Sequence, residues 1–185
     1  MIKNAKVVGE SNFSNIKKLV IAGVIVAIIV VVLLASITIV PAGHTGVVVT
    51  LGKVNEDVLQ EGLHIKAPFV QQIVKIDNRI VKLEVDTEAF SKDLQTVETT
   101  LAINYRVDTS KSYSIYKNIG ANYEAVLVTP AVNEVLKAIT AKYTAEESVT
   151  NRSLISEGLV EGLNEKLNAS GLYVTDVNII NFDFS

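Results

Sequence analysis

The sequence predicts an α+β protein: an N-terminal transmembrane helix, then one domain with antiparallel strands first, helices next and a closing strand last. Three observations predict it. An uncharged apolar stretch occupies residues 19–40, apolar residues then alternate with period two, and from residue 109 they recur with helical spacing. We therefore divide the chain into an N-terminal tail (1–18), a transmembrane helix (19–40) and a single domain (41–185).

The apolar stretch has the length and composition of a membrane anchor. Sixteen of the 22 residues from Leu19 to Val40 are Leu, Ile or Val, and none is charged. A helix rises about 1.5 Å per residue, so this stretch can cross a hydrocarbon core of about 30 Å. A cleaved secretory signal is the alternative, but its apolar core is usually only about 7–15 residues long. Pro41 also fits the nearest cleavage position badly, so we expect an uncleaved anchor.

Charge is distributed unequally around this stretch. Four lysines and one glutamate precede it, a net charge of about +3, whereas 13 basic and 19 acidic residues follow residue 40, a net charge of about −6. Lys17 and Lys18 stand directly before the anchor, where they would contact the membrane surface. Because positive charge stays on the untranslocated side, we expect a cytoplasmic (or matrix) N-terminus and the domain on the far side. The acidic domain has no basic run, which argues against nucleic acid as a partner.

Period-two alternation predicts the strands. The clearest runs from Val97 to Val107, where odd-numbered residues form an inward face and even-numbered residues an outward one. One buried face and one solvent-exposed face are typical of an antiparallel sheet that is covered on one side. Shorter strands are predicted at 47–51, 62–68, 73–77 and 80–87.

Helical spacing predicts three main helices in the second half of the chain, at 110–118, 122–143 and 150–168. Pro130 lies inside the second of these. Proline removes a backbone donor and clashes with the preceding turn, so we expect a kink or a new helix start near Thr129. A further turn of helix should begin at Thr144, because Thr144 to Glu147 has the spacing of a capping box.

The last helix and the last strand each contain an irregularity. Gly158 and Gly162 fall on the inward stripe of the helix, where glycine costs about 1 kcal/mol relative to alanine. This indicates that another segment packs closely there, and tolerated surface glycines are the alternative. The closing strand, 172–184, changes its alternation near Ile179, which predicts a β-bulge.

The sequence contains no recognisable catalytic constellation. Cysteine is absent, which excludes disulfides and thiolate chemistry, and neither a nucleophile elbow nor a phosphate-binding loop is present. His44 and His64 each lie beside glycine, and a metal would need a third ligand such as Glu61. We interpret both histidines as structural residues that are held by hydrogen bonds. We therefore expect no enzyme activity, no catalytic residue, no cofactor and no metal.

A short apolar segment is a candidate for membrane contact. Pro68, Phe69 and Val70 follow an apolar turn shortly after the anchor, where a loop can dip into the membrane interface. The alternative is that Phe69 belongs to the hydrophobic core.

Several segments in order resemble one family. They are PAGHTGVVVTLGKV, EGLHIKAPFVQQIVKID, SKDLQTVETTLAINYRV and IGANYEAVLVTPAVNEVLK, and the most specific is D-L-Q-x-V-x-x-T at Asp93 to Thr100. Together they resemble a prohibitin-type member of the SPFH superfamily, which also includes stomatins and flotillins. The resemblance extends from Pro41 to Ser185, and it implies an SPFH-type domain after the anchor.

The resemblance implies a scaffold. Proteins of this kind form homo- or hetero-oligomers with related chains, organise membrane lipids and partner proteins, and restrain a membrane-bound AAA protease. Prohibitin-type chains continue into a long charged helix that forms a coiled coil. Because this sequence shows none after Ser185, we expect a truncated chain or a short member. A membrane-tethered binding subunit acting as a monomer or small oligomer is the alternative. Residue usage favours a bacterial plasma membrane, and a mitochondrial inner membrane would give the same topology.

Overall fold

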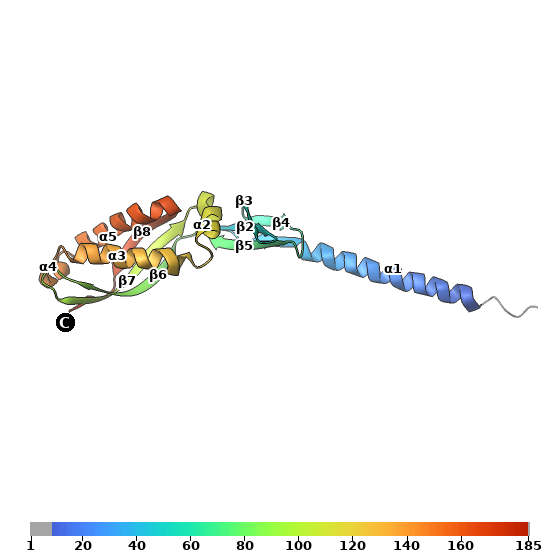
Figure 1. The fold of residues 1–185 in the computed structure, drawn as a ribbon, viewed down its shortest axis with the longest axis horizontal. Coiled ribbons are helices and arrows are strands. Elements are labelled where there is room, and N and C mark those ends of the chain that lie inside the picture. The colour runs from blue at the N-terminus through green and yellow to red at the C-terminus, as the bar shows by residue number, and fades with distance from the viewer. Residues whose placement is uncertain (1–8, 185) are drawn as a thin grey trace, which may run out of the picture.

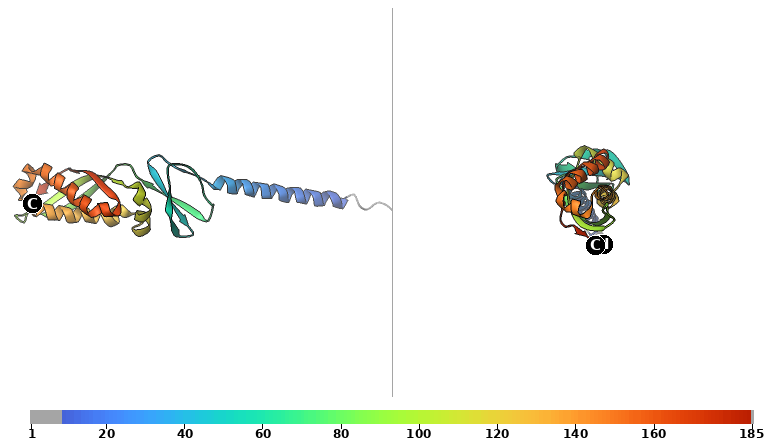
Figure 2. Two further views of the ribbon diagram at one scale, coloured as in Figure 1. Left: turned by 90° about the horizontal axis from the view of Figure 1, so that it is seen from above. Right: turned by 90° about the vertical axis from the view of Figure 1, so that its left-hand side faces the viewer.

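The protein is elongated, with one helix projecting from a two-lobed body. The computed structural model describes residues 9–184, so residues 1–8 of the expected N-terminal tail lie outside the described residues. Helix α1 (Gly9–Ala35) extends along the long axis at one end (Figure 1). The first lobe, residues 37–77, adjoins α1, and the second lobe, residues 81–184, lies beyond it, as the views in Figure 2 also show.

Antiparallel strands dominate the first lobe and helices cover a sheet in the second, so the α+β prediction is confirmed. The strands are β1 (Ile37–Val40), β2 (His44–Thr50), β3 (Lys53–Leu59), β4 (Gly62–Ile65), β5 (Gln71–Asp77), β6 (Val81–Phe90), β7 (Thr96–Val107), β8 (Leu172–Ile179) and β9 (Asp183–Phe184). The other helices are η1 (Thr109–Lys111), α2 (Ser112–Asn118), the π-helical turn η2 (Glu124–Val128), α3 (Thr129–Thr140), α4 (Ala145–Thr150), α5 (Arg152–Leu167) and η3 (Asn168–Ser170).

Three antiparallel sheets make up the two lobes. In the first lobe β1 pairs with β4 as a two-stranded ribbon, and β3, β2 and β5 form a separate sheet in that order. In the second lobe the order is β6, β7, β8, and β9 continues on the β8 side of β7. Helices α3 and α5 lie on one face of this sheet, over β6 and β8 respectively (Figure 1).

The main hydrophobic core lies between this sheet and its helices. The odd-numbered side chains of β7 from Val97 to Val107 are at most 3% exposed, which confirms the predicted inward face. On the predicted outward face Ala102 is also buried, so the alternation is interrupted there. Tyr105 belongs to the inward face, and its hydroxyl donates a hydrogen bond to the Glu124 carboxylate at the start of η2. The helices contribute fully buried side chains that include Val132, Leu136, Ile155, Leu159 and Leu163.

The predicted helix signals in the second lobe are confirmed. A new α-helix starts at Thr129, directly after the π-helical turn, and Pro130 occupies its first turn, where no backbone donor is needed. Thr144 forms the expected capping box with Glu147. A Cβ atom at Gly162 would lie 2.7 Å from Cγ1 of Val135, so α3 packs closely on α5 and the surface-glycine alternative is wrong.

The predicted end of the first helix is wrong. Helix α1 ends at Ala35, and Ile37–Val40 forms strand β1 instead of the last turns of a helix reaching residue 40. These four residues are all β-branched, and β4 lies alongside to pair with them. Residues 41–43 connect β1 to β2. Ser36 stays attached to the helix, because its backbone N–H donates to Val32 O.

Two other strand predictions need correction. Strand β3 was not predicted, because polar residues interrupt its alternation and the β2–β3 register shifts between Val47 and Val49. The closing strand is not one bulged strand: β8 ends at Ile179, and β9 resumes at Asp183. The register irregularity in β8 instead lies opposite Asn104 and Tyr105. The Thr100 backbone holds the segment between the two strands, because its carbonyl accepts from Ile180 N–H and its N–H donates to Asn181 Oδ1. Local alternation does not reveal this partner.

Candidate membrane-proximal surface

Helix α1 carries an exposed apolar surface along its length. Residues Ile16–Ala35 are long and apolar enough to cross a membrane, and none of this segment is buried against the rest of the protein. Twenty residues of helix extend about 30 Å, which equals the thickness of a typical hydrocarbon core. Any apolar surface next to Ala35 would therefore lie near the membrane boundary if α1 spans the bilayer.

The β1–β4 ribbon presents such a surface. Its register places Ile37 opposite Ile65 and Ile39 opposite Leu63. Because these pairs are separated by two residues along each strand, all four side chains share one face of the ribbon, and all four are exposed. Lys66 N–H donates to Ser36 O at 2.8 Å, which holds the end of β4 against the end of α1. At about 3.4 Å per strand residue, this face begins roughly 7 Å beyond the helix.

Two loops beside the ribbon expose apolar side chains in an unusual backbone conformation. Leu51 has a φ of 49° and is 81% exposed, and Phe69 has a φ of 66° and is 90% exposed. Left-handed backbone costs a residue with a Cβ about 1–2 kcal/mol. Leu51 N–H donates to Val70 O at 3.0 Å, so the two loops lie side by side and share an open hollow that Lys66 also lines.

The structure separates the residues predicted to contact the membrane into two groups. Lys17 and Lys18 are exposed near the start of the apolar segment of α1, roughly 25 Å of helix from the end of α1. Pro68, Phe69 and Val70 lie in the loop between β4 and β5, at the other end of the apolar segment. Phe69 points into solvent, so the alternative that placed it in the hydrophobic core is wrong.

Most of this surface was not predicted from the sequence. Ile37 and Ile39 were predicted to belong to the transmembrane helix, so no ribbon face was expected. A signal was present: Ile37, Ile39, Leu63 and Ile65 occur in two short runs with strict period-two alternation. Leu51 carried no comparable signal, because a positive φ at a leucine is not encoded by periodicity.

The two histidines lie in separate hydrogen-bonded settings. His44 Nδ1 lies 3.1 Å from Ala42 O, and His64 Nε2 lies 2.6 Å from Gln60 O. The carboxylate of Glu61 accepts a hydrogen bond from Gly43 N–H at 3.0 Å. Within residues 9–184, no group of three or more His, Asp or Glu side chains is arranged to hold a metal ion.

An ion pair stands at the junction between the lobes. The guanidinium of Arg79 donates to both carboxylate oxygens of Asp77, at 2.9 Å and 2.6 Å. These hydrogen bonds from Arg79 lower the pKa of Asp77 from 3.8 to about 2, and His44 adds a smaller favourable charge. Asp77 therefore remains ionised over the whole physiological range.

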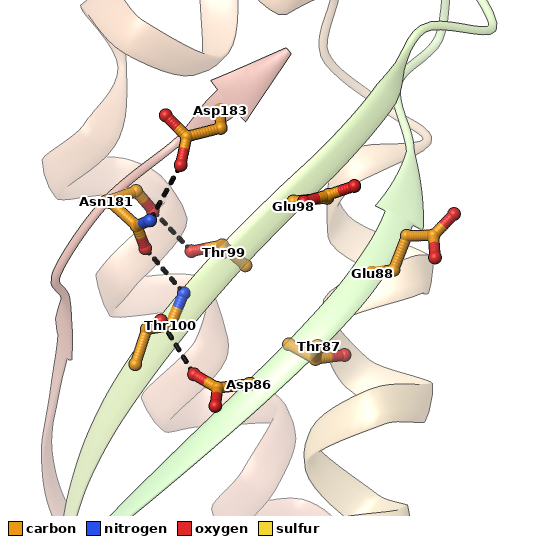
Figure 3. A pocket seen from close by; sticks show the side chains of 8 residues that line it. All are labelled: Asp86, Thr87, Glu88, Glu98, Thr99, Thr100, Asn181 and Asp183. Carbon is orange, nitrogen blue, oxygen red and sulfur yellow. Dashed lines mark hydrogen bonds between the residues drawn. The ribbon is translucent and has the colours of Figure 1, made fainter. Parts of the chain in front are cut away.

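An acidic hollow lies on the open face of the second-lobe sheet (Figure 3). Asn181 bridges two of its walls, because its Oδ1 accepts from Thr100 N–H at 2.7 Å and its Nδ2 donates to Asp183 at 2.8 Å. Thr100 in turn donates its hydroxyl to Asp86 at 2.8 Å. These hydrogen bonds attach the segment after β8 to the sheet. The polar side chains of the hollow therefore have a structural role. The lining residues are Asp86, Thr87, Glu88, Glu98, Thr99, Thr100, Asn181 and Asp183.

The chain has one helix that is apolar enough to cross a membrane, followed by a two-lobed α+β domain, and exposed apolar side chains lie at the junction of helix and domain. These features define the class of membrane-associated α+β proteins with one candidate membrane-spanning helix. A profile of the SPFH domain / Band 7 family matches residues 38–185. The chain belongs to this family, and it is a prohibitin-like member.

The relatives that support this assignment are prohibitins. Prohibitin-1 of Saccharomyces cerevisiae is 32% identical over 146 residues, which cover 78% of this chain and 51% of the relative. The "Mitochondrial prohibitin complex protein 1" of Caenorhabditis elegans is 36% identical over 131 residues, covering 71% and 48%. Prohibitin-2 of Mus musculus is 32% identical over 152 residues, covering 81% and 51%. The chain thus spans about half the length of the curated relatives it matches.

Proposed function

We propose that this chain is a non-enzymatic membrane scaffold that is anchored by α1 and assembles with copies of itself or with related SPFH chains. The observation that carries the proposal is the position of the exposed apolar surface of the first lobe. Its ribbon face, Leu51 and Phe69 all lie where α1 ends, which is the position that a membrane surface would occupy. Membership of the SPFH family and similarity to prohibitins support the scaffold role.

The proposed topology follows from charge. Lys17 and Lys18 remain on the cytoplasmic (or matrix) side, and the acidic two-lobed domain lies on the far side of a single span. A bacterial plasma membrane and a mitochondrial inner membrane both fit this topology. The C. elegans relative carries "mitochondrial" in its name, whereas the residue usage of this chain favours the bacterial membrane. The proposed partners are membrane lipids, related SPFH chains and a membrane-bound AAA protease.

Membrane contact gives a physical reason for the strained loops. In water, the left-handed backbone at Phe69 costs about 1–2 kcal/mol with no compensating contact. Burying a phenylalanine side chain contributes about 1.5–3 kcal/mol, so insertion into the membrane interface is large enough to offset a strain of this size. The same balance of strain and burial applies to Leu51 in the adjacent loop. Lys66 lines the same hollow, where its ammonium group can bind anionic lipid headgroups.

A single tryptophan can report this contact, because the chain contains none. In proteoliposomes containing lipids brominated on their acyl chains, the fluorescence of the Phe69→Trp variant should be strongly quenched. Leu94→Trp is the matched control, since Leu94 is also exposed and also has a positive φ but lies in the second lobe. Equal, weak quenching of both variants would contradict membrane contact by the loop.

The scaffold and the tethered-subunit alternative differ in particle size. We expect the detergent-solubilised full chain to form a discrete particle of many subunits, as measured by light scattering corrected for bound detergent. A monomer or dimer would reject assembly by this chain alone and favour the tethered binding subunit.

A further inference from the structure

The open hollow between the two apolar loops of the first lobe has polar groups of one kind in its lining. Lys66, Gln71 and Gln72 supply the polar side chains, and Leu51 and Phe69 stand at its apolar rim. None of the described residues that line it is Asp or Glu. Its volume of about 460 Å³ lies within the range of about 300–1,000 Å³ that is typical of small-molecule sites. The hollow is therefore suited to a group that carries negative charge.

The backbone places this hollow at the end of α1. Lys66 directly follows β4, and its N–H donates to Ser36 O at 2.8 Å, next to the last residue of the helix. The apolar segment of α1 is about as long as the hydrocarbon core is thick, and the headgroup region adds roughly 5–7 Å on each side. With α1 across the bilayer, the side chain of Lys66 lies at the level of the lipid phosphates.

The ammonium group of Lys66 has no counter-charge within the protein. Among residues 9–184, no carboxylate forms an ion pair with it, whereas Lys82 and Lys166 each pair with a glutamate. Lys66 is also partly buried, so its charge is partly removed from water. A cation in such a setting is stabilised by an anion that supplies charge-assisted hydrogen bonds.

The amide of Gln71 adds hydrogen-bond donors to the hollow. Its Oε1 accepts from Ala67 N–H at 2.8 Å, and the backbone N–H of Gln71 donates to Ala67 O at 2.9 Å. Because a backbone N–H only donates, this bond fixes which end of the amide is oxygen. The Nε2 group has no bond to another described residue, so both of its hydrogens are available to a ligand.

We propose that this hollow binds the phosphate of an anionic phospholipid in the leaflet that faces the domain. Lys66 and Gln71 donate to the phosphate oxygens, and Leu51 and Phe69 insert on either side of the headgroup. This inference rests on the proposed membrane contact and names the lipid class that the contact selects. A zwitterionic lipid binds more weakly, because its headgroup cation cancels the net charge and meets no carboxylate in the lining.

The Phe69→Trp chain reports which lipid occupies the hollow, because the chain has no other tryptophan. It is reconstituted in mixtures of phosphatidylglycerol and phosphatidylcholine of one composition, with bromine on the acyl chains of one lipid at a time. The quenching by each brominated lipid gives the relative binding constant of the two. We expect phosphatidylglycerol to bind about fivefold more tightly, which is the factor that one lysine contributes at an anionic surface.

Substitutions at Lys66 test its role in the same vesicles. Lys66→Gln should abolish the preference for phosphatidylglycerol, and Lys66→Arg should preserve it. Lys75→Gln is the matched control, because Lys75 is exposed in β5 of the same lobe and its loss changes the net charge equally, but it does not line the hollow. An equal loss of preference in Lys66→Gln and Lys75→Gln would overturn the proposal, since the attraction would then come from the lobe as a whole.

Gln71→Glu tests the second donor. Its carboxylate can still accept from Ala67 N–H, but it offers no hydrogen to a phosphate and adds a negative charge to the hollow. The preference for phosphatidylglycerol should therefore fall below that of the parent chain. Gln60→Glu, at an exposed position outside the hollow, should leave the preference unchanged. A Gln71→Glu variant with the preference of the parent chain would overturn the role assigned to Gln71.

The outcomes separate the headgroup site from the membrane contact on which it rests. Strong and equal quenching of the Phe69→Trp chain by both brominated lipids would retain the membrane contact and overturn the headgroup site. No quenching by either lipid would overturn both. Inorganic phosphate added at constant ionic strength should leave the preference unchanged. If it abolishes the preference, the hollow binds free phosphate and the assignment to a lipid is overturned.

Discussion

Replacing Gly162 by leucine should lower the free energy of unfolding of the second lobe by about 3 kcal/mol. Even the first added carbon would lie 2.7 Å from Cγ1 of Val135. Val135 is almost fully buried in α3, and a valine in a helix has one strongly preferred side-chain rotamer, so it cannot readily rotate away. Relief therefore requires α3 and α5 to separate, which would open the core beneath them.

Urea denaturation of the detergent-solubilised chain, followed by circular dichroism, measures this effect. Glu161→Leu is the control, because it adds the same side chain at the exposed neighbouring position and should change stability by no more than about 0.5 kcal/mol. A double-mutant cycle of Gly162→Ala with Val135→Ala should show favourable coupling, since the second change removes the atoms that the first one meets. A Gly162→Leu variant as stable as the Glu161→Leu control would show that the helices are not packed as described.

The second large effect is expected at the joint between the lobes. The Asn78→Ala substitution should lower the free energy of unfolding by about 3 kcal/mol. Asn78 Oδ1 accepts from Thr45 Oγ1 at 2.6 Å, and its Nδ2 donates to Val107 O at 3.2 Å and to Ser112 Oγ at 3.0 Å. Thr45 belongs to the first lobe, whereas Val107 and Ser112 belong to the second. Both hydroxyls are buried. Ser112 Oγ would keep its bond to Asp108 O at 3.3 Å, whereas Thr45 Oγ1 would lose its bond to Asn78, and a buried polar group that loses its partner costs about 1–3 kcal/mol.

Hydrogen exchange followed by mass spectrometry locates this effect. The Asn78→Ala variant should exchange faster in α2, which packs against the first lobe, and in β2 around Thr45. Asn55→Ala is the matched control, because within residues 9–184 the Asn55 side chain bonds to Thr50, in the same β2–β3 hairpin, and does not join the lobes. Protection in α2 that is unchanged from the parent chain would contradict a role for Asn78 in joining the lobes. A loosened joint would also free the second lobe from a fixed orientation relative to the membrane, so we expect less regular assembly.

The proposed membrane surface and the joint between the lobes are separate parts of the molecule. The end nearest α1 carries apolar residues that suit a membrane interface. Asn78 lies between the two lobes and links them through its hydrogen bonds to Thr45, Val107 and Ser112. Membrane binding and the joint can therefore be tested by separate substitutions, at Phe69 for the first and at Asn78 for the second.

Local signals in the sequence were sufficient for several elements. The apolar content of α1, the alternation along β7 and the capping box at Thr144 each depend on residues within one segment. The close packing at Gly162 was also predictable, because a glycine on the inward stripe of a helix leaves room for a neighbouring segment to approach. The resemblance that identified the family likewise depended on short ordered motifs rather than on contacts.

The sequence by itself determined the apolar N-terminal helix, the α+β class and the buried face of the main sheet, because hydrophobicity and its periodicity report which side of a segment leaves water. Tertiary structure alone decided where α1 ends, because Ile37–Val40 becomes a strand only when β4 pairs with it from more than twenty residues away. The same holds for the exposure of Phe69 and Leu94, whose strained backbones are held by hydrogen bonds within and between loops. Pairing and strain depend on partners distant in the chain, and no local pattern of apolar residues encodes those partners.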